Sequence, residues 1–571
     1  MKKIRILATL ALAMLLTVLP GCDRGRNIPG SEQEDPTKTQ LYICTYDGGY
    51  GIEWLNKAKL RFEEEYADVS FEEGKKGVQI FVKEDTNATG TMLEDSLPKS
   101  SYDIYFTEAV SYYDMVNKGL TYDITDVVQN PLNYDFQSKK IVDGESATIE
   151  SKMRDAHTSY FKTEEGKYFA IPFYEATYGI IYNIDLFEEN LLYFAQEGYG
   201  DGDGFITSLD DPRSAGPDND ITTEDDNGLP ATYDEFFALC DKMVGKGITP
   251  LLWGGTVQHY VNELVNSLQA DYEGAEQMRI NYTFDGTATN LVESINSDGT
   301  VKLYSEKITE ENGYLTWTKQ AGRYYGIKFV ERMLGKSNYF NSKKSFSITD
   351  YSHIDAQYDF VLGKYEREEF GMLIDGTWWH NEAKNAFSFG ENRYDKSAGS
   401  ANRKFGFMPL PKATKEQVGE GYTVLEANNS VCFINANINE AKVSAAKEFL
   451  QFCHTNESLA EFTVMTNACK PYTYTLDSKQ LESMPYWGRS IYKMHQSATF
   501  VSTYSTSPVY KRNASALTTG FQAEMFWTKV GGEDYNKVTT AIRDYKLTAE
   551  QYFNGLSAYL TPNEWNKNFL N

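Results

Sequence analysis

The alternation of short apolar segments with an amphipathic segment near the start of the chain constrains the fold most. Three segments rich in β-branched and aromatic side chains are predicted strands: residues 41–45, 77–82 and 102–106. A glycine loop at 46–51 follows the first of them, and Trp54, Ala58 and Phe62 then recur at helical spacing. Strands that alternate with helices predict an α/β fold with a parallel-rich sheet.

A further strand is predicted at 178–183, which is apolar, rich in aromatic and β-branched residues, and too short for a stable helix. The pair Ile171-Pro172 favours an extended entry to it. Glu175 lies between this pair and the predicted strand, and is flanked by Tyr174 and Tyr178. It is either an exposed loop acid or a polar group that faces a cleft.

The N-terminus predicts export. A basic start at residues 1–5 precedes about 14 mostly apolar residues, which is the length of a signal peptide and too short for a lasting membrane span. This segment ends in Leu19-Pro20-Gly21-Cys22, which resembles the lipobox of bacterial lipoproteins, in which the Cys is lipidated after cleavage. We therefore expect a signal peptide at 1–22, a lipid anchor on Cys22 at the outer face of the cell membrane, and a flexible polar tether at 23–40.

Length and charge narrow the class of partner. Roughly 530 residues remain after the tether, too many for one core, so two domains or more are expected. The net charge of -26 argues against nucleic acid and anionic lipid as partners. Five cysteines besides Cys22 show no metal-binding spacing and are predicted to be buried as small apolar residues.

Candidate binding residues follow from the predicted sheet, because ligands bind at the carboxyl ends of parallel strands. Asp47 and Glu108 lie at these ends, after the first and third strands. Their carboxylates would accept hydrogen bonds from ligand hydroxyl groups, with a surface position as the alternative. The 41 Tyr in the sequence would stack on sugar faces or serve in the core.

The order of several motifs resembles the extracellular solute-binding proteins of ABC importers, family 1, the maltose-binding-protein-like group. The motifs are the strand, glycine loop and helix at 41–62, then 102–126, 166–172 with 181–183, 229–236, 371–378 and 445–452. The resemblance implies two α/β lobes of the periplasmic-binding-protein (type II) fold, joined by crossing hinge strands. It implies lobe 1 at 41–175 plus 425–475 and lobe 2 at 176–424 plus 476–571, with the C-terminal helices packed on lobe 2.

The same resemblance places Glu175 at the first crossing, facing the cleft, and Trp378 in a turn that lines the sugar site. Trp253 ends an apolar segment before two glycines, which suits a stacking ring, and a packed core residue is the alternative. The expected ligand-binding set is Asp47, Glu108, Glu175, Trp253 and Trp378.

An acidic insertion at 198–228 holds nine acids and one base. Asp201, Asp203 and Asp210 match part of a calcium-binding loop, but Tyr199 stands where the first ligand is required. A structural Ca²⁺ and a solvated acidic loop without metal both remain open.

The expected function is capture of a carbohydrate, with an oligosaccharide favoured, and its delivery to permease subunits by a monomeric lipoprotein with no catalytic residues. Two alternatives remain: a secreted glycosidase, because paired carboxylates and aromatic rings also suit glycosidic cleavage, and a surface lectin or sensor that transports nothing.

Overall fold

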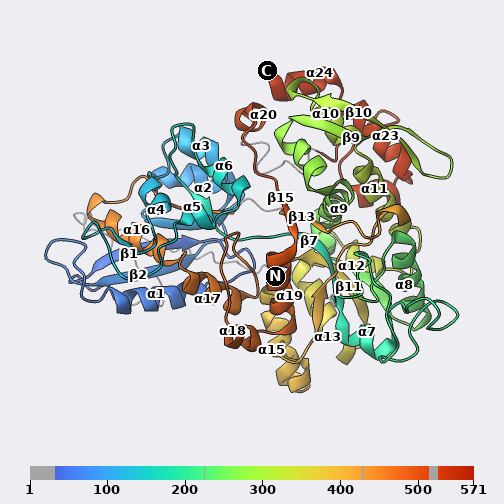
Figure 1. The fold of residues 1–571 in the computed structure, drawn as a ribbon, viewed down its shortest axis with the longest axis horizontal. Coiled ribbons are helices and arrows are strands. Elements are labelled where there is room, and N and C mark those ends of the chain that lie inside the picture. The colour runs from blue at the N-terminus through green and yellow to red at the C-terminus, as the bar shows by residue number, and fades with distance from the viewer. Residues whose placement is uncertain (1–32, 224–225, 427–429, 514–524) are drawn as a thin grey trace, which may run out of the picture.

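The computed structural model describes residues 33–571, except 224–225, 427–429 and 514–524 (Figure 1). The expected signal peptide, the lipidation site at Cys22 and the tether as far as residue 32 lie outside these residues. Among the residues described, no helix combines the length and apolar character needed to cross a membrane.

The first lobe is built on a five-stranded sheet in the order β2-β1-β3-β14-β6. Its strands are β1 (Thr39–Thr45), β2 (Val78–Glu84), β3 (Ile104–Glu108), β6 (Ile171–Pro172) and β14 (Ser430–Ile434). β1 is parallel to β2 and β3, whereas β14 is antiparallel to both β3 and β6. The carboxyl ends of β1 and β3 thus lie at one edge of the sheet, as the alternation of strands and helices predicts.

The second lobe contains a four-stranded sheet in the order β12-β7-β11-β8. Its strands are β7 (Tyr178–Asn183), β8 (Thr249–Leu252), β11 (Phe370–Gly376) and β12 (Phe405–Phe407). Only the β11–β8 pair is parallel in this sheet. The prediction of a parallel-rich sheet was therefore wrong for lobe 2, because β7 and β12 run opposite to their neighbours.

Three connections join the lobes, as the resemblance to the two-lobe fold implied. The chain passes from β6 to β7 through residues 173–177, and from β13 (Thr423–Glu426) back toward β14. It crosses a third time through α18 (Ser478–Ser483) and α19 (Tyr486–Ser497) to β15 (Thr499–Ser502), which pairs in parallel with β13. Figure 1 shows β7, β13 and β15 between the blue lobe and the green and yellow lobe.

Helices cover the sheet of lobe 1. They are α1 (Glu53–Glu65), α2 (Gly90–Ser96), α3 (Tyr112–Asn117), α4 (Thr125–Gln129), α5 (Ile149–Lys152), α6 (Asp155–Phe161), α16 (Val443–Phe452) and α17 (Asn456–Thr466). In α1, Trp54, Ala58 and Phe62 form one buried stripe, as their spacing predicts. This stripe packs against α17 and β2, so the helix fixes the glycine loop that precedes it.

Lobe 2 carries the longer helices. They are α7 (Ile184–Asn190), α8 (Tyr233–Gly245), α9 (His259–Thr283), α10 (Tyr314–Lys319), α11 (Ala321–Leu334), α13 (His353–Leu362), α14 (Trp379–Glu382), α15 (Lys384–Arg393), α22 (Val538–Arg543) and α23 (Ala549–Tyr559). α9 is interrupted at Gly274, whose φ is 72°. The hairpin of β9 (Gly286–Ile295) and β10 (Val301–Ile308) follows α9.

The C-terminal part of the chain does not pack on lobe 2 alone. α22 and α23 contact α9 and α11, as expected, but α18 contacts α17 of lobe 1. The expectation that all helices after about residue 480 pack on lobe 2 was therefore wrong for α18, because this helix belongs to the third crossing connection.

The five cysteines within the described residues, at positions 44, 240, 432, 453 and 469, are free and buried. This confirms the prediction that they serve as small apolar residues.

Candidate functional site

The glycine loop after β1 brings lobe 1 to its contact with lobe 2. Gly48, Gly49 and Gly51 all have positive φ, from 55° to 83°, a conformation that favours glycine. The Asp47 carboxylate accepts a hydrogen bond from the backbone N–H of Gly51 at 2.5 Å, and the Asp47 carbonyl accepts one from the N–H of Tyr50 at 2.9 Å. Asp47 therefore shapes the loop with one carboxylate oxygen.

This loop touches lobe 2 directly. A Cβ built on Gly49 would lie 3.0 Å from the Trp378 ring, so only glycine fits here. The Asn381 side-chain amide of α14 donates a hydrogen bond to the Gly49 carbonyl at 2.7 Å. Lys384 of α15 pairs with Glu53 of α1 at 2.9 Å, and adds a second link between the lobes. The two lobes are thus closed against each other at this edge.

Three aromatic rings meet beside the loop. The Trp378 ring packs edge-on against Tyr178 with centroids 4.9 Å apart, and Tyr260 of α9 lies 5.1 Å from Tyr178 and 6.1 Å from Trp378. Trp378 is 5% exposed. A sugar ring can stack on the Trp378 face only when the lobes separate and expose it.

Carboxylates from both lobes converge on these rings. Burial, followed by the charge of Glu382, raises the pKa of Glu108 to about 7. The same two causes raise the pKa of Asp375, at the end of β11, to about 7. Gln357 of α13 donates hydrogen bonds to Asp375 at 3.1 Å and to Glu382 at 2.6 Å, and His353 contacts Glu382 at 3.3 Å. Acids that repel one another in a buried place are typical of functional sites.

Tyr46 belongs to the same cluster. Burial, followed by the charges of Glu108, Asp47 and Glu382, raises the pKa of Tyr46 to about 12. Its hydroxyl therefore stays protonated near neutral pH and can donate a hydrogen bond. Hydroxyl donors, carboxylate acceptors and stacking rings together suit a polyhydroxylated ligand.

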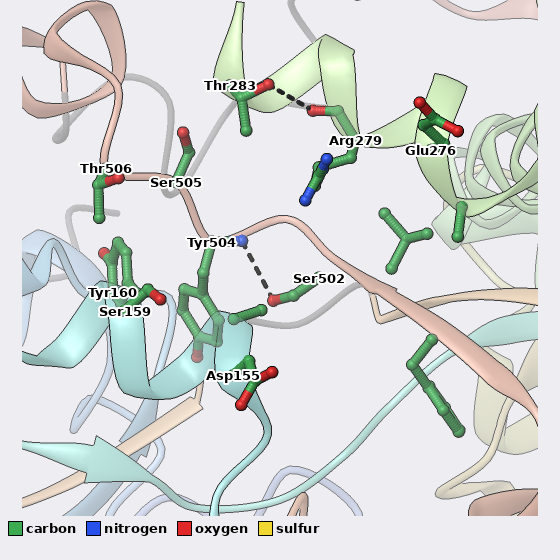
Figure 2. Close-up of a pocket in the computed structure, with 14 residues that line it drawn as sticks. Asp155, Ser159, Tyr160, Glu276, Arg279, Thr283, Ser502, Tyr504, Ser505 and Thr506 are labelled. Carbon is green, nitrogen blue, oxygen red and sulfur yellow. Dashed lines mark hydrogen bonds between the residues drawn. The ribbon is translucent and has the colours of Figure 1, made fainter. Parts of the chain in front are cut away.

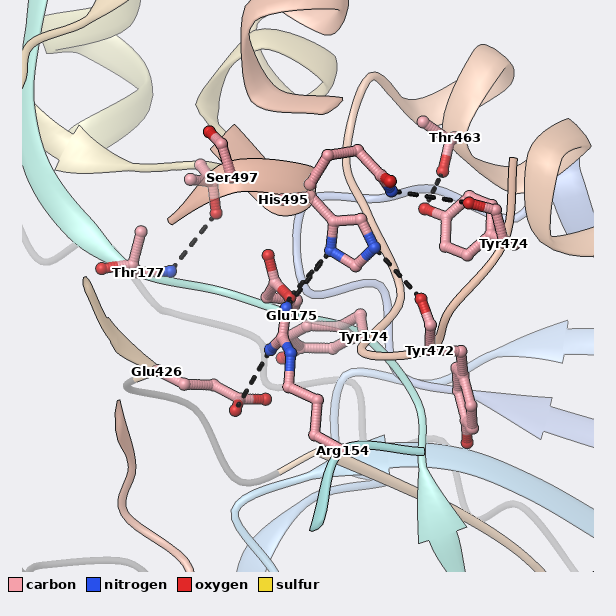
Figure 3. Close-up of polar contacts among 12 residues, drawn as sticks. Arg154, Tyr174, Glu175, Thr177, Glu426, Thr463, Tyr472, Tyr474, His495 and Ser497 are labelled. Atoms are coloured by element: carbon pink, nitrogen blue, oxygen red, sulfur yellow. Dashed lines mark hydrogen bonds and ion pairs between the residues drawn. The ribbon is translucent and has the colours of Figure 1, made fainter. Parts of the chain in front are cut away.

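Glu175 lies in the first crossing connection, but its carboxylate is engaged within the protein (Figure 3). Arg154 forms an ion pair with it, and the Nδ1 atom of His495 lies 3.1 Å from its Oε2 atom. Burial would raise the pKa of Glu175, but Arg154 and His495 outweigh burial and lower it. Glu175 is 5% exposed. A ligand-binding role for it stays a prediction, and its position assigns it to the hinge.

Two more residues complete this hinge cluster, which we define as Arg154, His157, Glu175, Glu426 and His495. His157 Nε2 lies 2.9 Å from the Glu426 carboxylate, and the Arg154 guanidinium lies 3.8 Å from Glu426. The cluster thereby links α6, both crossing segments and α19. The ion pairs of the cluster connect the segments that must bend if the lobes move.

Trp253 is in the core of lobe 2. It is 0% exposed and packs against Phe340 and Phe346, with ring centroids 5.4 and 5.3 Å away. The expectation of a stacking ring in the cleft is corrected here, because apolar side chains cover the ring at the end of β8. The alternative of a packed core residue is the one that the structure supports.

The acidic insertion has a counter-ion on the helix that follows it. Lys242 of α8 lies 2.6 Å from Asp201 and 3.5 Å from Asp203, whereas Asp210 is exposed. In the described part of the chain, no group of three or more His, Cys, Asp or Glu side chains is arranged to bind a metal ion. Both alternatives, a structural Ca²⁺ and an acidic loop without metal, stay untested, and Lys242 contacts two of the three predicted ligands.

A cavity of about 640 Å³ lies on the other side of the crossing segments (Figure 2). It is lined by residues of α6, of the C-terminal half of α9 and of the segment 500–506. None of the five residues predicted from the sequence to bind ligand lines it.

The structure brings together Asp47, Glu108 and Trp378 among the predicted residues. It adds Tyr46, Tyr260, His353, Asp375 and Glu382, which sequence reasoning missed. Asp375 and Glu382 flank the predicted Trp378 turn, so that turn was an available signal for them. Tyr260 and His353 come from helices far along the chain and had no such signal.

Comparison with known proteins agrees with this architecture. Residues 67–482 match the family described as bacterial extracellular solute-binding protein. A solved structure described as a chitin oligosaccharide binding protein is 16% identical, with a TM-score of 0.54 over 93% of this chain and 99% of that chain. A structure from work on xylan utilization by the thermophilic bacterium Caldanaerobius polysaccharolyticus is 11% identical, with a TM-score of 0.52 over 91% and 100%. At these identities the likeness concerns the fold. No curated protein sequence matches the chain.

Proposed function

Since the chain belongs to the bacterial extracellular solute-binding proteins, we propose that it is the substrate-binding component of an ABC importer. It captures a carbohydrate, preferably an oligosaccharide, between its two lobes and delivers it to the permease subunits. The observation that carries this proposal is the meeting of Asp47 and Glu108 from lobe 1 with Glu382 and the rings of Tyr178, Tyr260 and Trp378 from lobe 2, where the lobes touch.

The arrangement supports a binding cycle of opening and closure. The polar links between the lobes at this edge include the Asn381–Gly49 hydrogen bond and the Lys384–Glu53 ion pair. Exposed ion pairs of this kind contribute little, about 0–1 kcal/mol. Ligand contacts can therefore decide whether the lobes stay closed, and the crossing segments provide the hinge.

The proposal includes attachment to the cell. The lipobox-like sequence before Cys22 supports export and lipidation of this residue. The tether predicted at 23–40 is too long at its end, because Thr39 and Gln40 belong to β1 and Asp35 is hydrogen-bonded to Gln79. A shorter flexible tether that begins at residue 23 would still let the protein reach a permease from the outer face of the membrane. We propose a monomer, because both lobes that form the cleft belong to one chain. A mass increase on Cys22 in protein isolated from membranes, absent from a Cys22→Ser variant, tests the anchor.

A thermal-shift screen tests the carbohydrate function. A chain that begins at residue 33 holds every described element and is screened against mono- and oligosaccharides, with product analysis of each hit. A sugar that binds the native state raises the melting temperature. Recovery of the intact sugar supports a binding protein, whereas cleaved products would replace it with a glycosidase. A stabilising sugar that cells without this gene still import normally would favour a lectin or sensor.

A further inference from the structure

The cleft carries negative charge that the described residues do not balance. Glu108 ends β3 in lobe 1, and Glu382 ends α14 in lobe 2, near enough for their charges to interact. No other described residue forms an ion pair or a side-chain hydrogen bond with Glu108. The Glu108 side chain is half-buried. A partly desolvated carboxylate beside a like charge, with no counter-ion, is unfavourable, so a group outside the described residues is expected to compensate it.

A second group points to the same place. The Tyr174 hydroxyl is buried and has no hydrogen-bond partner in the described part of the chain, and Tyr174 is 1% exposed. A Cβ built on Gly48 would lie 3.5 Å from this hydroxyl and 3.6 Å from the Glu108 Oε2 atom. Glu108 and Tyr174 therefore face a common point beside the glycine loop. Buried polar groups usually find a partner, and a ligand atom would supply one here.

The basic groups around the cluster are already engaged or uncharged. His353 contacts Glu382 at 3.3 Å, and Lys384 pairs with Glu53 at 2.9 Å. Burial, followed by the charges of Lys537 and His353, lowers the pKa of His259 to about 4, so this side chain is neutral near pH 7. Further titratable groups that face the cluster are acids and tyrosines: Asp47, Asp375, Tyr46, Tyr50, Tyr178 and Tyr260.

The charge of the ligand follows from this imbalance. If the lobes closed over a neutral ligand, these carboxylates would lose water without gaining a cation. Closure would then be favourable only if the carboxylates bound protons. A positive group on the ligand would pair with Glu108 and would face the rings of Tyr178 and Trp378, which attract cations. A metal ion fits less well, because no suitable group of ligands exists among the described residues.

We infer that the cleft binds a glycan that carries a protonated amine, with the ammonium group between Glu108 and the Tyr174 hydroxyl and a sugar ring against Trp378. This inference rests on the proposed carbohydrate function and adds the charge of the ligand to it. The ammonium group donates hydrogen bonds to the carboxylate and to the hydroxyl oxygen, and satisfies both.

Titration calorimetry with matched sugars tests the inference. The chain from residue 33 is titrated with three sets of sugars: β-1,4-linked glucose oligomers, glucose and galactose. Each sugar is used in three forms, which carry at C2 a free amine, an acetylated amine or a hydroxyl. The free amine is expected to bind at least about tenfold more tightly than either neutral partner, as for a hydrogen bond between charged groups. Equal or tighter binding of a neutral sugar overturns the inference and leaves the proposed function intact. Absence of binding across all sets counts against both.

The variant Glu108→Gln keeps the shape of the side chain and removes its charge. It is expected to abolish the preference for the amine, while Glu73→Gln, an exposed acid elsewhere on lobe 1, retains it. A measurement on the native chain is independent of the folding of either variant. Titration at a pH well below the pKa of the free amine, where the amine is already protonated, in two buffers of different ionisation enthalpy should show proton release with the amine and proton uptake with a neutral sugar. Proton uptake with the amine would overturn the inference.

Discussion

The side-chain amide of Asn381 donates a hydrogen bond over 2.7 Å to the carbonyl of Gly49, and thereby joins the two lobes next to the Trp378 ring. A Cβ built on the same glycine would lie only 3.0 Å from that ring. One backbone position thus serves both the closure of the lobes and the edge of the binding cleft. The predictions below follow from this contact, the hinge cluster and the buried acids.

Replacement of Gly49 by alanine is expected to weaken ligand binding by about tenfold or more, because its Cβ would press on Trp378 and hold the lobes apart. The matched control is Gly74→Ala. Gly49 and Gly74 have φ of 83° and 78°, so both variants lose about 1 kcal/mol to backbone strain, but nothing lies within 4 Å of a Cβ at position 74. Calorimetry and thermal melting compare the two. Equal affinities would show that closure does not require the contact.

The hinge cluster predicts stability that depends on pH. Because the pKa of Glu175 is lowered from its ordinary 4.5, ionised Glu175 stabilises the folded state above that pH, and this contribution is lost as the pH falls through the lowered value. The Glu175→Gln variant is therefore less stable near pH 7, by about 2 kcal/mol or more, and the difference shrinks under acid. Denaturant unfolding at several pH values measures it.

The control for this experiment is Glu164→Gln. The Glu164 side chain is 86% exposed, so its loss should change the free energy of unfolding by no more than about 0.5 kcal/mol at any pH. A Glu175→Gln variant with a constant deficit at all pH values would contradict the account of the cluster.

The raised pKa of Glu108 predicts a dependence of stability on pH opposite to that of Glu175. Its pKa is raised to about 7, so the folded state holds its proton more tightly than the unfolded state does. Ionisation of Glu108 therefore costs stability increasingly as the pH rises from about 4.5 toward 7. Relative to the native chain, Glu108→Gln should gain up to about 2 kcal/mol at pH 8 and nothing near pH 4. A melting-temperature difference that is equal at both pH values would exclude an ionising Glu108 as its source.

The acidic insertion is expected to be insensitive to calcium, because the Lys242 ammonium already forms an ion pair with Asp201 and lies near Asp203. Addition of Ca²⁺ or of a chelator should leave the melting temperature unchanged. A calcium-dependent increase that is lost in Asp201→Asn would instead establish the structural ion.

The local pattern of the sequence predicted much of the framework. The strand at 178–183 and the stripe of Trp54, Ala58 and Phe62 were correct, because hydrophobic period and side-chain type determine such elements locally. The antiparallel strands of lobe 2 were not predicted, since strand direction depends on connections made across the whole chain.

The site was less predictable. Neighbouring residues of an extended segment point to opposite sides, so Tyr174 meets the glycine loop while Glu175 meets Arg154 and His495. A shift of one residue along this segment therefore decides whether a side chain faces the glycine loop or the hinge cluster. The sequence alone does not determine which residue faces which side. The prediction of a stacking role for Trp253 was wrong for another reason. Phe340 and Phe346, which cover its ring, come from a distant part of the chain.

The most direct test of the binding account is the affinity of the Trp378→Ala variant for the tightest-binding sugar from the thermal-shift screen, measured by calorimetry. Trp378 lies where both lobes meet, so its truncation should weaken binding by about 2 kcal/mol, or roughly 30-fold. The exposed aromatic Phe389, 44% accessible on lobe 2, provides the control variant Phe389→Ala, which should bind as the native chain does. A folded Trp378→Ala variant with native affinity would contradict the placement of the ligand in this cleft.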